Sequence, residues 1–258
     1  MTASPSDAPA HTIHHATHQP DPTLSSHAAQ GGLSAPHASP AAELSRLTLR
    51  LKSALRQFPD FPSPGILFED ILPIFADPEL HQRLVRALEL AVVQQFGGAK
   101  PDIVVGLDAR GFLFGPSLAL RLNAGFVPVR KRGKLPGPCE TAEFVKEYGS
   151  DFFQMQQGAI QSGQKVLIVD DIIATGTCSS SPVSARLDPA LPVRFQPKAN
   201  TDHEPGGSAS AAGSLVKKLG GTTIGYLFIL ELDFLKGRDK LDAPVHTLLT
   251  GQEEKLQQ

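Results

Sequence analysis

Short, continuous runs of β-branched and aliphatic residues, separated by segments with helical periodicity, most limit how this chain can fold. The runs are Ile103–Leu107, Phe126–Val129, Val166–Val169 and Thr222–Leu230. Strands that are apolar at consecutive positions are buried on both faces, as in parallel sheets covered by helices on both sides. The sequence therefore predicts an α/β fold with a doubly wound, mostly parallel sheet. In such a fold, ligands bind beyond the carboxyl ends of the strands.

Four segments between or before these runs have helical spacing of apolar residues. In one of them, Asp77 is the expected N-cap, Pro78 the first helical residue, and the pair Gly97-Gly98 the end. The other predicted helices cover Leu44–Gln57, Phe112–Leu122 and the segment from Ala211 to Leu219.

Two stretches do not resemble a folded core. Residues 1–40 consist mainly of Pro, Ser, Ala and His and hold six of the nine histidines. Such a composition buries too little apolar surface to offset chain entropy, so we expect a disordered tail. A histidine-rich metal-binding tract is the alternative, but no regular ligand spacing supports it. Residues 41–258 then form one domain, interrupted by a second odd stretch at 177–206 that has five prolines and no periodicity.

Charge and composition exclude several classes of protein. The 258 residues include 24 Lys and Arg against 26 Asp and Glu, which argues against nucleic-acid binding through a basic surface. No apolar run approaches the ~20 residues of a membrane-spanning helix, so no membrane partner is expected. The two cysteines, Cys139 and Cys178, exclude a disulfide scaffold, and without a signal peptide we expect a cytoplasmic location.

Two adjacent carboxylates follow one of the predicted strands. Val166–Val169 leads directly into Asp170 and Asp171, and Ala174, Thr175 and Gly176 come shortly after. Charged groups at such a position need polar partners, and the vicinal hydroxyls of a sugar would donate to them. The small residues can wrap backbone N–H groups around a phosphate. For an isolated pair, the alternative is one Asp capping a helix and one facing solvent.

This stretch does not stand alone, and together with four others it resembles a known family. Residues 166–176 resemble the phosphoribosyl-diphosphate (PRPP) motif of type I phosphoribosyltransferases. The other four segments are similar to those of adenine phosphoribosyltransferases, of a fungal type. They are residues 58–71, residues 106–116, residues 129–137 followed by 147–149, and residues 231–238. The chain has neither the Gly-rich phosphate motif of nucleoside triphosphatases nor that of dinucleotide enzymes.

The resemblance implies a fold and a reaction. The fold is the type I phosphoribosyltransferase fold with a small N-terminal hood and a mobile loop. The reaction joins adenine to PRPP and gives AMP and pyrophosphate in purine salvage. Mg²⁺ arrives with PRPP and is held by substrate oxygens and water rather than by dedicated protein ligands. Members of the family form homodimers, to which the apolar segment Phe112–Leu122 could contribute.

The resemblance also assigns roles to residues that handle the leaving pyrophosphate. Arg110 is the best pyrophosphate ligand, because a guanidinium grips two phosphate oxygens at once. Gly106 and Gly111 would let the backbone of this loop approach a ligand, and the Asp108–Ala109 peptide bond is expected to be cis. Arg130 and Lys134 belong to a lid over residues 130–138 that would close over pyrophosphate.

For the purine, the resemblance implies stacking on Phe68, with the base edge read by the backbone of Leu67 and by Glu69. Some members of the family have Arg in place of Glu69, so a role for that side chain is open. Glu147 is the expected group that handles a proton near the purine, with Tyr148 beside it. Asp170 and Asp171 would bind the ribose hydroxyls.

The stretch 177–206 lies inside the expected phosphate loop. Deleting it joins Gly176 to Gly207 and Ser208 and restores the family pattern of loop and helix. It is either a genuine excursion of the chain or a translated intron, and our hypothesis is the intron. A split loop also leaves open a second function, that of a catalytically impaired regulator that binds PRPP or a nucleotide. A third reading is an enzyme that uses another purine base.

Overall fold

The computed structural model describes residues 39–61, 67–146, 149–174, 207–232 and 237–250. The predicted tail divides from the rest of the chain near residue 37, and residues 1–38 lie outside the described part, as do residues 177–206. No helix in the described part is long and apolar enough to cross a membrane.

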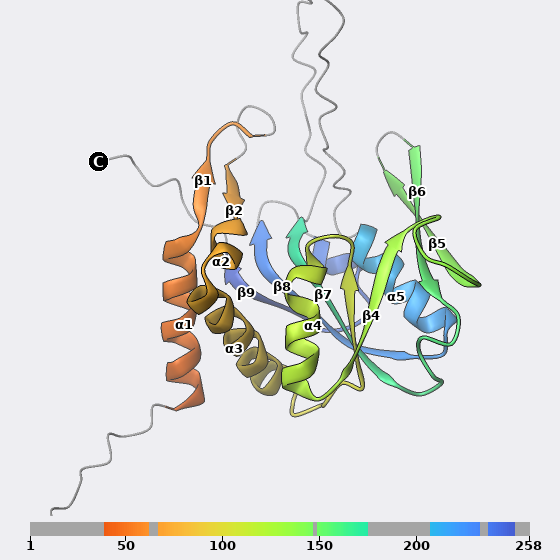
Figure 1. Cartoon of the computed structure of the whole chain (residues 1–258), viewed down its shortest axis with the longest axis horizontal. Coiled ribbons are helices and arrows are strands. Elements are labelled where there is room, and N and C mark those ends of the chain that lie inside the picture. Colours follow the sequence, from red (N-terminus) through yellow and green to blue (C-terminus); the bar gives the residue numbers. More distant parts are fainter. Residues whose placement is uncertain (1–38, 62–66, 147–148, 175–206, 233–236, 251–258) are drawn as a thin grey trace, which may run out of the picture. The chain divides into compact units, whose positions relative to one another are not determined.

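Five α-helices and nine strands make up the described part of the domain (Figure 1). The helices are α1 (Pro40–Ala54), α2 (Leu72–Ala76), α3 (Pro78–Gln95), α4 (Gly111–Leu122) and α5 (Gly207–Lys218), with a 3₁₀ turn at Gly237–Lys240. The strands are β1 (Arg56–Phe58), β2 (Phe68–Asp70), β3 (Ile103–Leu107), β4 (Gly125–Lys131), β5 (Cys139–Lys146), β6 (Gly149–Gln156), β7 (Lys165–Ala174), β8 (Thr222–Leu232) and β9 (Val245–Thr250).

The main sheet has seven strands in the order β5-β6-β4-β3-β7-β8-β9. The five strands from β4 to β9 in this order run parallel, and four of them, β4, β3, β7 and β8, are the predicted strands. The antiparallel β5–β6 hairpin at one edge was not predicted, and neither was β9 at the other. The prediction of a mostly parallel α/β sheet is confirmed.

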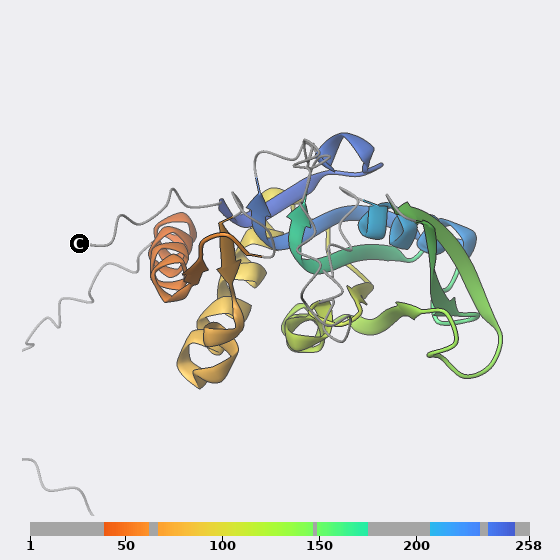
Figure 2. The ribbon, with the colours of Figure 1, turned by 90° about the horizontal axis from the view of Figure 1, so that it is seen from above.

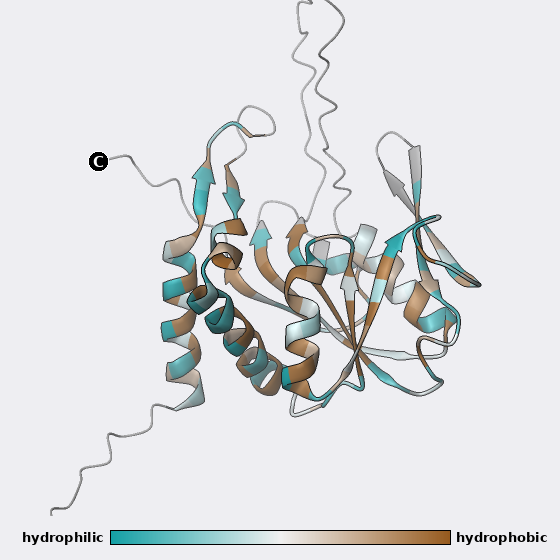
Figure 3. Ribbon diagram, in the orientation of Figure 1, coloured by the Kyte–Doolittle hydropathy of each residue, from teal (hydrophilic) through white to brown (hydrophobic). Residues whose placement is uncertain are grey.

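Two apolar cores lie on opposite faces of this sheet. In β7, Leu167 and Val169 belong to the core under α1–α4, whereas Val166 and Ile168 belong to the core with α5 and the β5–β6 hairpin. Figure 2 shows α4 and α5 on opposite sides of β7. The central strands are apolar along their length, and the outer helices show alternating polar and apolar stripes (Figure 3).

The N-terminal boundaries differ from the prediction. The first helix begins at Pro40, with the Ser39 hydroxyl accepting a hydrogen bond from the backbone of Ala42, so the predicted tail is two residues too long. The helix ends at Ala54, and Arg56 and Gln57 lie in β1 rather than in the predicted helix. The reason is cross-strand pairing with β2. Arg56 contacts Asp70 at 2.6 Å, and Gln57 donates to Glu69 at 3.3 Å.

The other predicted helices are confirmed. The Asp77 carboxylate caps α3 by accepting hydrogen bonds from the backbone of Glu79 at 2.8 Å and Leu80 at 3.2 Å. After this helix, Gly97 and Gly98 take positive φ values of 60° and 74°, which glycine adopts without strain. The fifth helix begins at Gly207, the first residue after the stretch 177–206.

An ion pair at the end of β8 connects three segments. Arg238 contacts both carboxylate oxygens of Glu231, and it also donates to the Val245 carbonyl at 2.9 Å and to the Thr247 hydroxyl at 2.8 Å. Hydrogen bonding to Arg238 lowers the pKa of the buried Glu231 carboxyl below its ordinary value of 4.5, and Thr247 adds to the effect. This pair therefore joins β8 and β9 to the 3₁₀ turn.

Replacing Arg238 by Gln is expected to reduce the free energy of unfolding by about 1–2 kcal/mol at neutral pH, because a buried carboxylate loses its charged partner. A carboxyl with a lowered folded pKa stabilises the protein above its ordinary pKa and loses that contribution as pH falls. The difference between variant and wild type should thus shrink below about pH 4.5. Denaturant unfolding at several pH values measures it, with Arg83→Gln, which breaks an exposed helical pair, as the control.

Candidate active site

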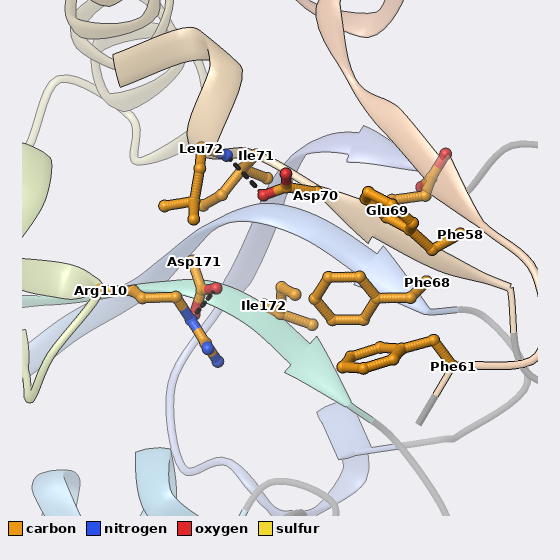
Figure 4. Close-up of a pocket in the computed structure, with 10 residues that line it drawn as sticks. All are labelled: Phe58, Phe61, Phe68, Glu69, Asp70, Ile71, Leu72, Arg110, Asp171 and Ile172. Carbon is orange, nitrogen blue, oxygen red and sulfur yellow. Dashed lines mark hydrogen bonds and ion pairs between the residues drawn. The ribbon is translucent and has the colours of Figure 1, made fainter. Parts of the chain in front are cut away.

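A cavity of about 330 Å³ lies between the β1–β2 hairpin and the carboxyl end of β7 (Figure 4). Its walls are mostly apolar, with charged groups at one side. The lining residues are Phe58, Phe61, Phe68, Glu69, Asp70, Ile71, Leu72, Arg110, Asp171 and Ile172. A planar heteroaromatic base fits such a space, because small-molecule sites combine apolar walls with a few convergent polar groups.

The aromatic wall of the cavity belongs to the hairpin. Phe68 opens β2 and packs edge to face against Phe61, with ring centroids 5.2 Å apart and planes inclined by 70°. The predicted stacking residue therefore does line the cavity, and Leu67 lies half-buried next to it. In Figure 4 the Glu69 carboxylate points away from Ile172 and Asp171. The Glu69 carboxylate accepts a hydrogen bond from the Gln57 side chain on β1 at 3.3 Å.

The two adjacent strand-end acids, Asp170 and Asp171, interact with each other. Asp171 lines the cavity and pairs with Arg110, whereas Asp170 is not among the residues that line it. The alternation of side chains along the strand shifts here, because Ile172 also lines the cavity and Ile173 packs in the α5 core. Regular strand alternation therefore does not describe the end of β7.

The electrostatic surroundings of Asp170 and Asp171 differ. Burial raises the pKa of the Asp170 carboxyl well above its ordinary value, and the negative charge of Asp171 adds to this shift. Asp170 accepts a hydrogen bond from the backbone of Asp171 at 2.9 Å. The side chain of Asp171 is 2% exposed and forms an ion pair with the Arg110 guanidinium. One of the two acids thus has a cationic partner within contact distance, and the other is the more costly to ionise.

The loop after β3 has the expected peptide geometry. The Asp108–Ala109 bond is cis, which confirms the prediction. Arg110 follows as the residue before α4, and its side chain is 43% exposed. Gly111 was expected to make room for a ligand, but a Cβ atom there would lie 2.8 Å from the carbonyl oxygen of Val169. At Gly106 a Cβ atom would meet the ring of Phe126, so both glycines are required by packing within the protein.

Replacing Gly111 by Ala is expected to reduce the free energy of unfolding by about 2–3 kcal/mol, because the backbone of β7 cannot move away from the added methyl group. Thermal or denaturant unfolding measures the loss. The half-exposed Ser117 on the same helix provides the control, and its replacement by Ala should change stability by no more than about 0.5 kcal/mol. Equal stability of the two variants would show that the approach of α4 to β7 is not tight.

The predicted lid begins on a strand. Arg130 lies in β4, donates to the Asp108 carboxylate at 3.0 Å and to the backbone carbonyl of Lys134 at 3.1 Å. The side chain of Lys134 is exposed. The turn that follows is tied to β6, since the Gly133 N–H donates to the Gln154 side chain at 2.8 Å. Arg130 therefore links this turn to the loop that carries Arg110.

The expected phosphate loop is described only at its two ends. Ala174 ends β7, and Gly207 and Ser208 begin α5, so the N-terminal N–H groups of a 12-residue helix lie in the predicted cradle. Thr175 and Gly176 lie outside the described residues, as do Glu147 and Tyr148. Their predicted roles in phosphate binding and proton handling remain predictions.

Comparison with known proteins decides the family. A model of the phosphoribosyl transferase domain matches residues 77–178. An adenine phosphoribosyltransferase from Debaryomyces hansenii is 56% identical over 215 residues, which cover 83% of this chain and 97% of that protein. This chain belongs to the adenine phosphoribosyltransferases.

Solved structures of adenine phosphoribosyltransferases agree with this assignment. The Saccharomyces cerevisiae enzyme, crystallised with adenine and an imino-altritol bisphosphate, is 51% identical, with a TM-score of 0.66. The match covers 80% of this chain and 99% of that one. The enzyme from Thermoanaerobacter pseudethanolicus is 36% identical with a TM-score of 0.63, over 79% of this chain and 99% of the other.

Several lining residues of this adenine phosphoribosyltransferase site were not predicted. Ile172 directly follows the predicted acid Asp171, and Phe58 and Phe61 lie in the segment that carried the resemblance. The two Phe residues could have been found from the density of phenylalanine, because three in the eleven positions 58–68 are more than a short hairpin needs for its own packing. Asp70 gave no such signal, and its carboxylate accepts a hydrogen bond from the backbone of Leu72 at 2.9 Å.

Proposed function

We propose that this chain transfers the 5-phosphoribosyl group of PRPP to adenine, forming AMP and releasing pyrophosphate, as a step of purine salvage. The observation that carries the proposal is the cavity in which the hood residue Phe68 lies opposite the strand-end residue Ile172, with Arg110 and Asp171 at its side (Figure 4). The crystallised relative from S. cerevisiae, which binds adenine, supports the choice of base. The comparisons give no support to the alternative of a catalytically impaired regulator.

The reaction defines what the site must supply. Adenine N9 forms a bond to C1′ of PRPP while the bond from C1′ to the diphosphate oxygen breaks. The electron pair of the broken bond leaves with pyrophosphate, and N9 loses its proton. Positive charge develops at C1′ and negative charge on the leaving group, so the protein must align the reactants and neutralise the diphosphate.

Positively charged side chains near the loop after β3 are suited to binding the negatively charged pyrophosphate. The Arg110 guanidinium is partly exposed beside the cavity, and Arg130 is joined through Asp108 to the same loop. We assign both, together with Lys134 and the backbone of Ala109, to pyrophosphate. We assign Asp170 and Asp171 to the ribose hydroxyls. The 5′-phosphate is assigned to Ala174, Thr175, Gly176, Gly207 and Ser208, because the latter two begin α5.

At the base, Phe68 provides the stacking face, and the backbone of Leu67 and Glu69 reads the purine edge. Glu147 is proposed to take the N9 proton, with Tyr148 beside it. The support for these two residues is their place in the sequence motif, directly after β5.

Mg²⁺ is proposed to enter with PRPP. Among the described residues, no three His, Cys, Asp or Glu side chains converge on one metal position. Carboxylates at the end of β7 are nevertheless the oxygen donors that Mg²⁺ accepts, and the ion commonly keeps its waters and binds substrate phosphates. When bound, it neutralises part of the diphosphate charge. Removal of divalent cations with EDTA should then abolish turnover.

The proposed function is tested by incubating the full-length chain with PRPP, Mg²⁺ and labelled adenine and measuring labelled AMP. Competition with unlabelled adenine, hypoxanthine and guanine establishes the base, and we expect only adenine to reduce the formation of labelled AMP at equal concentration. Failure to form AMP, while pyrophosphate and ribose 5-phosphate still bind, would favour a regulator. A stronger reduction of labelled AMP by hypoxanthine or guanine than by adenine would reassign the acceptor.

Two further properties are proposed. We propose a homodimer, because α4 presents Leu113 and the 82% exposed Leu120 at its surface, and large apolar side chains on one helix favour a protein interface. Light scattering across concentrations tests it. We also propose a cytoplasmic location, since Cys139 is a free cysteine in the described part of the chain. Localisation of a fluorescent fusion tests that.

A further inference from the structure

An ion pair joins the two strands of the β1–β2 hairpin beside the purine cavity. The Nε atom and one Nη atom of Arg56 both donate to the same carboxylate oxygen of Asp70, at 3.2 Å and 2.6 Å. The other oxygen of Asp70 accepts the backbone N–H of Leu72, the first residue of α2, at 2.9 Å. The side chain of Asp70 is 10% exposed and that of Arg56 is 62% exposed. Asp70 therefore connects an arginine at the surface to the start of α2.

The same arginine also contacts the aromatic wall of the cavity. Its guanidinium carbon lies 5.8 Å from the centroid of the Phe58 ring, a distance at which a cation is attracted to an aromatic face. Phe58 and Asp70 both line the cavity, whereas Arg56 is not among the residues that line it. Arg56 thus supports two lining residues from outside the cavity.

The hairpin depends on such support because it is small and separate from the main sheet. Its two strands have three residues each and form a two-stranded sheet of their own. A two-stranded hairpin is at best marginally stable by itself. The register pairs Arg56 with Asp70 at one end and Phe58 with Phe68 at the other. An interaction that fixes the first pair therefore also helps to fix the Phe68 ring in the cavity.

The groups assigned to the rest of the substrate belong to other elements. In Figure 4 the Phe68 ring points toward Ile172, and the Asp70 carboxylate lies beside Leu72. Arg110 precedes α4, and Asp171 lies on β7. A disturbance confined to the hairpin should therefore change the surroundings of the base more than those of the ribose and the phosphates.

We propose that Arg56 and Asp70 are positioning residues for the purine base. This inference rests on the proposed function and deepens it, because the pair acts on the base through Phe58 and Phe68 rather than by touching it. The pair holds β1 in register with β2, so that the aromatic wall is in place before the base arrives. Such preorganisation increases affinity because less conformational freedom is lost on binding.

Calorimetric titration of the full-length protein with two probes separates the base from the sugar. AMP contains the purine and ribose 5-phosphate lacks it, so the ratio of their dissociation constants measures the contribution of the base. In Arg56→Gln and in Asp70→Asn we expect AMP to bind about 10-fold more weakly and ribose 5-phosphate to stay within about twofold of wild type. In a steady-state assay, the KM for adenine should rise in both variants while kcat and the KM for PRPP change by less than about twofold.

Two further variants distinguish positioning from a general loss of stability. Arg56→Lys keeps the positive charge and should recover most of the affinity for AMP. Arg83→Gln makes the matched change in an exposed helical pair and should leave both affinities unchanged. AMP and ribose 5-phosphate affinities that fall by the same factor in Arg56→Gln, or an unchanged affinity for AMP in both hairpin variants, would overturn the proposal.

The same titrations keep this inference apart from the proposed function. Wild-type protein that binds AMP no more tightly than ribose 5-phosphate would contradict the proposed function, and this inference with it. A contribution of the base that is present in wild type and equally large in Arg56→Gln and Asp70→Asn would overturn this inference alone.

Discussion

A variant in which Gly176 is followed directly by Gly207 is expected to use PRPP at least about 100-fold more efficiently than the 258-residue chain. The reason lies in the two described ends of the phosphate loop. Ala174 is the last residue of β7, and Gly207 is the first residue of α5. Backbone N–H groups on both sides of the removed residues have to converge on one phosphate.

The additional 30 residues change the free energy of folding little through chain entropy, because the cost of closing a loop grows only as about (3/2)RT ln n. Placement matters far more, since a displacement of about 1 Å at a catalytic centre can reduce the rate about 100-fold. We therefore expect kcat/KM for PRPP to rise on deletion while the free energy of unfolding changes little.

The matched control replaces residues 177–206 with an equally long Gly/Ser segment. If length is what disturbs the loop, this control should be as weak as the full chain. Equal PRPP affinity and turnover in the full chain and the deletion variant would contradict the prediction. Sequencing the mature transcript answers the separate question of origin, because a message that still encodes these residues excludes the intron hypothesis.

The centre of the fold was predictable because burial leaves a strong pattern in the sequence. Strands such as β3 are buried at every position, and the Asp77-Pro78 pair marks the start of α3 within one residue. The β5–β6 hairpin has no such pattern. Glu140 and Glu143 interrupt its apolar residues, and its stability comes from pairing across eight registered positions. Those pairs are fixed by tertiary structure, which short-range periodicity does not encode.

The sequence predicted individual site residues that lie within one motif. It did not predict the contacts between segments that are distant in the chain. Phe68, Arg110 and Asp171 each lie in a recognisable motif, and all three line the cavity. Which neighbours they contact depends on the hairpin packing over the end of β7, more than 100 residues away in the chain. The shift of alternation at Asp171 and Ile172 has a counterpart in β8, where Ile229 and Leu230 both enter the core under α1–α4. It involves two neighbouring strands of the sheet, so the sequence of one strand does not predict it.

Replacing Asp170 by Asn is expected to weaken PRPP binding by about 100-fold or more while making the unliganded protein more stable at neutral pH. Two hydrogen bonds from ribose hydroxyls to a charged acceptor, each contributing about 1.5–3 kcal/mol, account for the loss of binding. The stability gain has a separate cause. Burial and the charge of Asp171 raise the pKa of the Asp170 carboxyl, so its ionisation is harder in the folded protein than in the unfolded chain.

The sign of the pH dependence follows from that raised pKa. When a folded protein holds a proton more tightly than the unfolded chain, stability falls as pH rises from the ordinary carboxyl pKa, here 3.8, through the raised value. Asn has no proton to lose, so the variant should gain on wild type as pH rises and should match it near pH 4. Denaturant unfolding and PRPP titration measure the two effects, and Asp239→Asn, at an exposed carboxylate, should change neither. An Asp170→Asn variant that is less stable at every pH, or that keeps its affinity for PRPP, would mean that this carboxylate is a structural group, and that ribose recognition lies elsewhere at the strand end.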